Sequence, residues 1–231
     1  MGQIFSSFFA ALSQAGDARF RNVLFIGIAL TIGLLVLVTL GTIWILNFLL
    51  PETVSLPLIG EITWLNEVLS GASLLVILGM SVFLMIPVAS AFTGIFLERI
   101  ADAVEAKHYP GLPAATPVPL LDTMRDTFGF LALMIGVNLL ALILYVIFAP
   151  FALFIFWVVN GFLLGREYFQ LVAMRRIGRA GAKQARSRHA FTIWVAGTLM
   201  AIPLTIPILN LVIPIMGVAT FTHLYHRLED A

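Results

Sequence analysis

The stretch Ile202-Pro-Leu-Thr-Ile-Pro-Ile-Leu-Asn-Leu-Val-Ile-Pro214 puts three prolines in the middle of an uncharged apolar tract, residues 190–222. Proline lacks a backbone donor and interrupts a helix. The tract is therefore expected to form two short arms, each of about 12 to 14 residues and roughly 20 Å long. Because a hydrocarbon core is about 30 Å thick, we predict a re-entrant hairpin that enters and leaves the membrane on one side.

Three more tracts carry no charged residue: 23–50, 68–97 and 128–165. The chain is 61% hydrophobic and 11% charged, whereas charged residues make up roughly a quarter of soluble proteins. The first two tracts are long enough to cross a bilayer as tilted helices. No stretch alternates with the period of a lipid-facing barrel strand. The predicted fold class is an all-α integral membrane protein with two long transmembrane helices.

Charge asymmetry predicts the topology. Residues 51–67 contain three glutamates and no Lys or Arg, whereas residues 166–189 contain seven basic residues. By the positive-inside rule the second segment is cytoplasmic and the first lies outside. Tract 128–165 then begins and ends inside, so it is a hairpin with a turn near Ala149-Pro150. Its two arms of about 18 residues, roughly 27 Å each, are marginal for a full double crossing.

The predicted layout is a single membrane domain over residues 1–231, with both termini cytoplasmic and all thirteen Lys and Arg on one side. Its segments are an amphipathic N-terminus (1–22), a helix (23–50), an outside loop (51–67), a helix (68–97), a cytoplasmic segment (98–127), an inward-dipping hairpin (128–165), a basic cytoplasmic segment (166–189), the re-entrant hairpin (190–222) and a tail (223–231).

The tip of the last hairpin is a candidate anion path, because broken helices at membrane depth expose backbone dipoles. An equally supported interpretation is that the prolines only make a structural turn. The candidate tip residues are Pro203, Thr205, Pro207, Asn210 and Pro214.

Charged residues gather where the tracts meet the cytoplasm. Arginine offers a planar fork of donors that suits oxyanions, and a nearby glutamate orients it or competes with the ligand. The alternative is that these residues anchor the topology. The candidates are Arg19 and Arg21 before the first tract, Glu98 after the second, and the pair Arg166 and Glu167 after the third.

Several chemistries are not expected. The chain has no cysteine, and no nucleotide-binding or hydrolase motif is present, so we predict neither an enzyme nor a cofactor. His223 and His226 alone make no convincing metal site. A basic run beside a membrane favours lipid headgroups over nucleic acid. That run comprises Arg175, Arg176, Arg179, Lys183, Arg186 and Arg188.

The chain resembles the CysZ sulfate permeases and the wider etoposide-induced-protein family over nearly its whole length. The resemblance is carried by Ser13-Gln-Ala-Gly-Asp-Ala-Arg-Phe20, Ala91-Phe-Thr-Gly-Ile-Phe-Leu-Glu98, Gly165-Arg-Glu-Tyr-Phe169, Ile202-Pro203 and Pro214-Ile-Met-Gly-Val-Ala-Thr220. It implies an oligomeric bacterial inner-membrane protein that moves sulfate inward for cysteine synthesis. A Gly-Leu/Ile-Arg-Arg motif is associated with sulfate binding in that family. Gly16 and Arg19 match it, whereas Asp17 and Ala18 occupy its apolar and first arginine positions.

We therefore expect an anion permease or channel, with sulfate as the substrate and Gly16, Arg19, Arg21 and Glu98 as the binding residues. The competing hypothesis is a non-transporting membrane scaffold, in which the basic segment 166–189 binds anionic lipid or a protein partner.

Overall fold

The computed structural model describes residues 2–23, 25–26, 29, 33, 36–37, 40–41, 44, 55–56, 60–61, 96–206, 209 and 212–229. Most of the predicted spans 23–50 and 68–97 lies outside these residues, as do Pro207 and Asn210. The chain divides into two units, Ile26–Ala91 and the remainder.

Within the unit Ile26–Ala91, all the described residues between 26 and 44 are helical. Strands β1 (Ser55–Leu56) and β2 (Gly60–Glu61) pair antiparallel, with Ser55 opposite Glu61. This short ladder lies in the predicted outside loop and was not expected from the sequence.

The larger unit is helical throughout its regular structure in the described residues. Its elements are α1 (Gly2–Gln14), α4 (Glu98–His108), α5 (Leu120–Ile147), the 3-10 turn η2 (Ala149–Phe151), α6 (Ala152–Arg188), α7 (Ala190–Ala201), the 3-10 turn η3 (Ile202–Thr205) and α8 (Ile213–Glu229). A further helical stretch covers residues 18–23.

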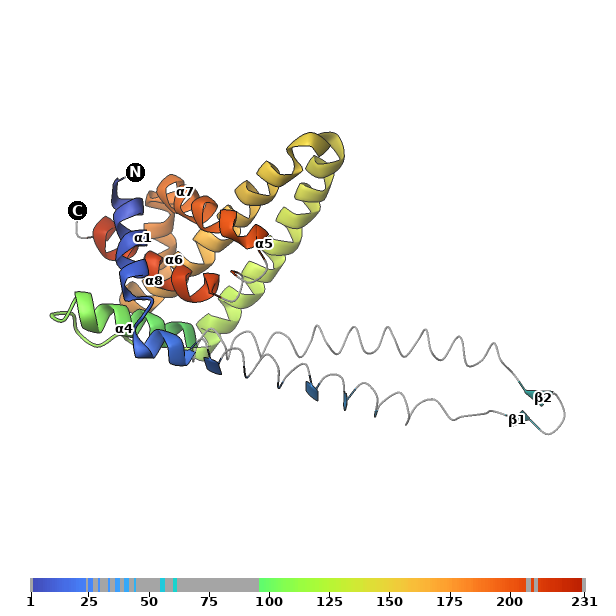
Figure 1. Ribbon diagram of the computed structural model, residues 1–231, viewed down its shortest axis with the longest axis horizontal. Coiled ribbons are helices and arrows are strands. Elements are labelled where there is room, and N and C mark those ends of the chain that lie inside the picture. The colour runs from blue at the N-terminus through green and yellow to red at the C-terminus, as the bar shows by residue number, and fades with distance from the viewer. Residues whose placement is uncertain are drawn as a thin grey trace. The chain divides into compact units, whose positions relative to one another are not determined.

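Helices α5 and α6 meet at η2, where the sequence predicts a turn, and their ribbons run together toward it (Figure 1). Both helices are long and apolar enough to cross a membrane. They are also longer than the 18-residue arms expected from the apolar tract. Helix α5 is longer because it begins at Leu120, inside the predicted cytoplasmic segment, and its 28 residues span about 42 Å.

Glycine allows α6 and α7 to approach closely. A Cβ on Gly197 would lie 2.0 Å from the carbonyl oxygen of Gly161, and one on Gly165 would lie 2.5 Å from that of Ile193. Gly161 and Gly165 have the small-xxx-small spacing by which membrane helices bring their backbones together. Helix α7 has 12 residues, about 18 Å, so alone it does not cross a bilayer.

The core of this unit lies among α1, α4, α6 and α8 (Figure 1). Helix α1 turns one face inward, formed by Ile4, Ser7, Ala11 and Gln14 at helical spacing. The largest fully buried side chains include Phe20, Phe169, Phe221, Ile100 and Leu224. By contrast, most side chains of α5 are exposed.

Candidate functional site

The start of the helical stretch 18–23 is fixed by two polar contacts. Gln14 Nε2 donates to the buried carbonyl of Ala103 in α4, at 3.1 Å. Asp17 Oδ1 accepts from the backbone N–H of Arg19, at 2.9 Å. Asp17 is therefore the N-cap of this helix, a position at which aspartate is favoured. The hydrogen bond from the Arg19 amide holds the pKa of the Asp17 carboxyl below its usual value.

Arg19 and Arg21 are both exposed, and neither guanidinium forms an ion pair or hydrogen bond within the described part of the chain. The buried Phe20 lies between them. Residues two apart are separated by about 200° around a helix, so the two arginines lie on opposite flanks. The structure thus leaves both cations available but does not bring them to one face.

The other two predicted ligands lie differently. Gly16 is exposed, and a Cβ at this position would have open space around it. No close contact therefore requires glycine here. Glu98 is half-buried at the start of α4 and pairs with neither arginine among the described residues. Burial raises the pKa of Glu98, and the neighbouring Arg175 opposes that effect.

At the tip of the last hairpin, the amides of Ile206, Leu209 and Val212 each donate to a carbonyl three residues earlier. Successive turns thus satisfy these three amides within the backbone. The Thr205 hydroxyl likewise donates to Ile202, at 2.9 Å. Pro203 and Pro214 are half-buried, in η3 and in the first turn of α8.

Arg166 and Glu167, predicted as a rim charge pair, form no ion pair with each other in the described part of the chain. The Arg166 guanidinium instead lies over the Phe130 ring, 5.7 Å from its centroid. Glu167 is half-buried.

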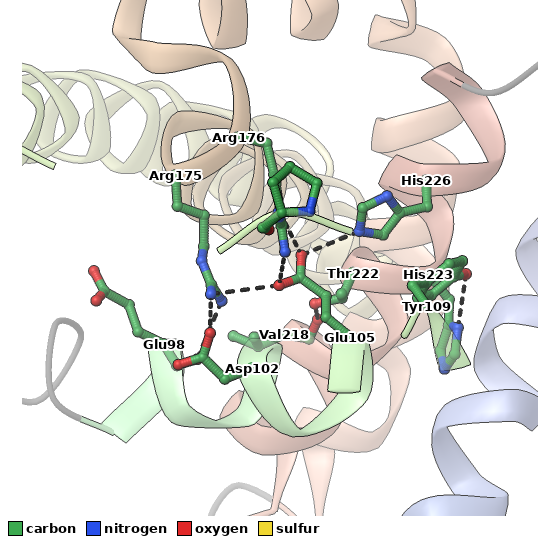
Figure 2. Close-up of polar contacts among 11 residues, drawn as sticks. Glu98, Asp102, Glu105, Tyr109, Arg175, Arg176, Val218, Thr222, His223 and His226 are labelled. Atoms are coloured by element: carbon green, nitrogen blue, oxygen red, sulfur yellow. Dashed lines mark hydrogen bonds and ion pairs between the residues drawn. The ribbon is translucent and has the colours of Figure 1, made fainter. Parts of the chain in front are cut away.

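The sequence reasoning missed a polar junction of α4, α6 and α8, formed by Asp102, Glu105, Arg175, Arg176 and His226 (Figure 2). Arg176 donates two hydrogen bonds to the Glu105 carboxylate, and its Nε lies 2.8 Å from Oε1. His226 Nε2 lies 3.1 Å from the same oxygen. Arg175 pairs with Asp102, and its Nη2 lies 3.4 Å from Glu105 Oε2.

Most of this junction is buried, although Asp102 is exposed. The side chains of Arg175 and Glu105 are only 4% and 5% exposed. Burial alone would raise the pKa of Glu105, but the hydrogen bonds from His226 and Arg176 lower it to about 2. Glu105 of α4 is thus an anion that is bound by the arginines of α6 and by His226 of α8.

Next to the polar junction, His223 is buried and bonded to Tyr109, with its Nδ1 3.1 Å from the tyrosine oxygen. Burial, with the positive charges of His108, Arg227 and His226, lowers the pKa of His223 to about 4. His223 and His226 thus bind different partners, Tyr109 and Glu105. In the described part of the chain no group of residues suits a metal ion.

The polar junction occupies part of the basic run that was predicted to contact lipid headgroups, and the lipid contact itself stays a prediction. Arg175 and Arg176 are bound within the fold, and Arg179 pairs with Asp126 at 2.6 Å. Helix α6 is interrupted at Gly178, whose positive φ of 69° is a conformation that favours glycine. Because this break ends the first helical part of α6, the carbonyl of Arg175 accepts from Thr116 instead, at 3.1 Å.

A pocket of about 350 Å³ adjoins the polar junction. Its lining comprises Leu112, Pro113, Ala114, Thr116, Arg175, Arg176, Ile177, Tyr225, His226 and Glu229. The cationic groups facing it are already bound to Glu105, so the pocket offers little unbalanced charge to a ligand.

Two helices long and apolar enough to cross a membrane, one of them with mostly exposed side chains, indicate a helical membrane protein. The family model described as Sulfate transporter CysZ/Etoposide-induced protein 2.4 matches residues 7–214, and the chain belongs to this family. The family resemblance expected from the sequence is thereby confirmed. Neither the comparison with curated proteins nor that with solved structures gave a match.

Proposed function

We propose that the protein is a sulfate permease or channel of the bacterial inner membrane that supports sulfur assimilation, and that it works as a homo-oligomer. Membership of a sulfate-transporter-type family supports this proposal. In this proposal both termini face the cytoplasm, and residues 190–222 form a re-entrant hairpin beside the anion path. The contact of Arg227 with Ser6, which ties α8 to α1, is compatible with termini on one side.

The observation that carries the proposed site is that Arg19 and Arg21 are exposed without a counter-ion in the described chain. Asp17 caps the helix through the Arg19 amide, so its charge is partly used by the backbone. The helix geometry favours two successive contacts, one on each flank of Phe20, over a single anion held by both side chains. Among the described residues, Arg175, Arg176 and Arg179 of the basic segment are paired within the fold, which leaves less of that segment for the scaffold alternative.

The test is uptake of radiolabelled sulfate into liposomes that contain only this protein, with phosphate and chloride as competitors. The double variant Arg19→Ala, Arg21→Ala is expected to lose most of the flux while remaining inserted. Arg99→Ala removes one exposed arginine outside the proposed site and is the matched control. Equal uptake by the double variant and the wild type would refute the proposed site, and no uptake by the wild type would refute the function.

A further inference from the structure

Helix α1 carries an apolar stripe that faces away from the core. The stripe is formed by Phe5, Phe9 and Leu12, which are 51%, 61% and 49% exposed and recur on one side of the helix. The opposite side packs against α8, which lies beside α1 (Figure 1). That buried side includes the polar residues Ser7 and Gln14, which are 0% and 1% exposed. A surface helix of a soluble protein has the reverse arrangement, with its polar side outward.

The side chains of this stripe suit lipid better than a second helix. Phe8 is half-buried at the edge of the stripe, and its ring packs edge-to-face on that of Phe9, with the centroids 5.9 Å apart. Helices that associate within membranes use small residues, which let their backbones approach closely, whereas this stripe presents bulky rings. Residues 1–16 also contain no charged side chain that could form an ion pair with a partner protein.

The chain leads from α1 directly toward the membrane. Eight residues, 15–22, separate Gln14 at the end of α1 from Val23, where the first uncharged tract begins. Part of this link is helical, so it is shorter than an extended chain. Phe25, within the uncharged tract, is 66% exposed. The exposed stripe therefore lies only a short link away from a segment that is predicted to enter the bilayer.

We propose that α1 lies along the surface of the lipid bilayer and inserts the stripe at the boundary between headgroups and acyl chains. Interfacial helices bury an apolar face rich in Phe and Leu about 5–10 Å deep at this boundary. The other side of α1 is held by the protein, through its packing on α8 and the contact of Arg227 with Ser6. The proposal requires only that the chain is inserted in a membrane, and it holds whether or not the chain moves an anion.

The experiment measures which side of α1 is in contact with lipid. The chain has no cysteine, so each engineered cysteine carries a single nitroxide spin label. Phe5→Cys and Phe9→Cys place the label on the stripe. Gln3→Cys is the matched control, because Gln3 is exposed on the same helix but lies about 200° around it from Phe5.

The labelled full-length chains are reconstituted in phosphatidylcholine liposomes. Electron paramagnetic resonance then compares collisions of each label with oxygen, which concentrates in the bilayer, and with a water-soluble nickel chelate. The oxygen-to-nickel ratio should be several-fold higher at Phe5 and Phe9 than at Gln3. A ratio no higher than that at Gln3 would overturn the proposal, because the stripe would then not be the side in lipid. Labels that collide with neither reagent would also overturn it, since protein would cover the stripe. Dipolar broadening between labels would identify that cover as a second copy.

A second variant tests whether the phenylalanines hold α1 at the bilayer. In a chain labelled at Leu12→Cys, adding Phe5→Ser and Phe9→Ser should lower the ratio toward that of Gln3→Cys. An unchanged ratio would refute the proposal, because the rest of the fold would then place α1 in lipid without the stripe. Melting temperatures check the fold. A stripe variant that fails to fold is replaced by the Leu12→Cys label alone, or by Phe9→Ser in place of the double change. No flux is measured, so the result is independent of the transport test.

Discussion

The arm formed by α5 and the first half of α6 and the polar junction of α4, α6 and α8 are built in opposite ways. Along α5, side chains such as Leu139, Leu142 and Val146 are at least 60% exposed. At the polar junction, the charged groups of Arg175 and Glu105 are almost fully buried. Apolar side chains outside and paired charges inside reverse the arrangement of a soluble protein.

This difference teaches where each region obtains its stability. A bilayer removes the cost of exposing the α5 side chains, so the arm needs only backbone hydrogen bonds and close contact at α6 and α7. The polar junction has no such support. It depends on every buried charge having a partner, because an unmatched buried charge is far more costly than an absent pair.

The largest effect is expected from Glu105→Ala, which leaves Arg175 and Arg176 without their shared carboxylate. Breaking one partner of a buried ion pair costs about 3–5 kcal/mol of unfolding free energy. Denaturant titration in detergent, followed by tryptophan fluorescence, measures it. Asp122→Ala removes a carboxylate from a more exposed pair and should cost less than about 1 kcal/mol. Equal losses in the two variants would show that the polar junction does not differ energetically from the surface.

The arm could be predicted from the sequence better than the polar junction could. The uncharged tracts and the Ala149-Pro150 turn are local signals, and the structure has its turn at Ala149–Phe151. Asp102 and Glu105 do lie on one helical face of residues 98–108, which is a visible signal. Their partners, however, are about 70 residues away, so no local pattern predicts which basic residues they bind.

Two other features show which contacts a local sequence pattern predicts and which it does not. Asp17 stands directly before a helical run, and N-cap preference alone predicts its hydrogen bond to the Arg19 amide. In contrast, the helix break at Gly178 depends on the tertiary contacts on both sides, because isolated glycines also occur within continuous helices.

A smaller effect is expected where the arm meets α7. In Gly197→Ala the new methyl group would meet the backbone oxygen of Gly161 at 2.0 Å, so the helices must separate. Overpacking of this kind costs about 1–3 kcal/mol. Gly136→Ala on α5 is the matched control, because its Cβ meets nothing within 4 Å. Unfolding of both variants in lipid bicelles measures the difference, and similar stability would contradict the close contact of α6 with α7.

The smallest effect is expected from pH, and it concerns His223, which lies next to the polar junction. The pKa of His223 is lowered from 6.5 to about 4, so the folded state favours its neutral form. The stabilisation from His223 is therefore present above pH 6.5 and is lost as the pH falls toward 4. One proton changes the unfolding free energy by at most about 1.4 kcal/mol per pH unit. Burial also lowers the pKa of His108, which adds to the same trend.

Glu105 responds in a different window. With its pKa lowered from 4.5 to about 2, its contribution is lost only as the pH falls below 4.5. Glu105 therefore stays ionised at both pH 7.5 and pH 5.5, and a difference in unfolding between these two values reports other groups, His223 among them. In His223→Phe the loss between these two pH values should become smaller, although the absolute stability also falls because Tyr109 loses its hydrogen bond to His223. If the pH dependence of His223→Phe were as steep as that of the wild type, His223 would have to be solvated in the folded protein. That result would contradict its burial next to the polar junction.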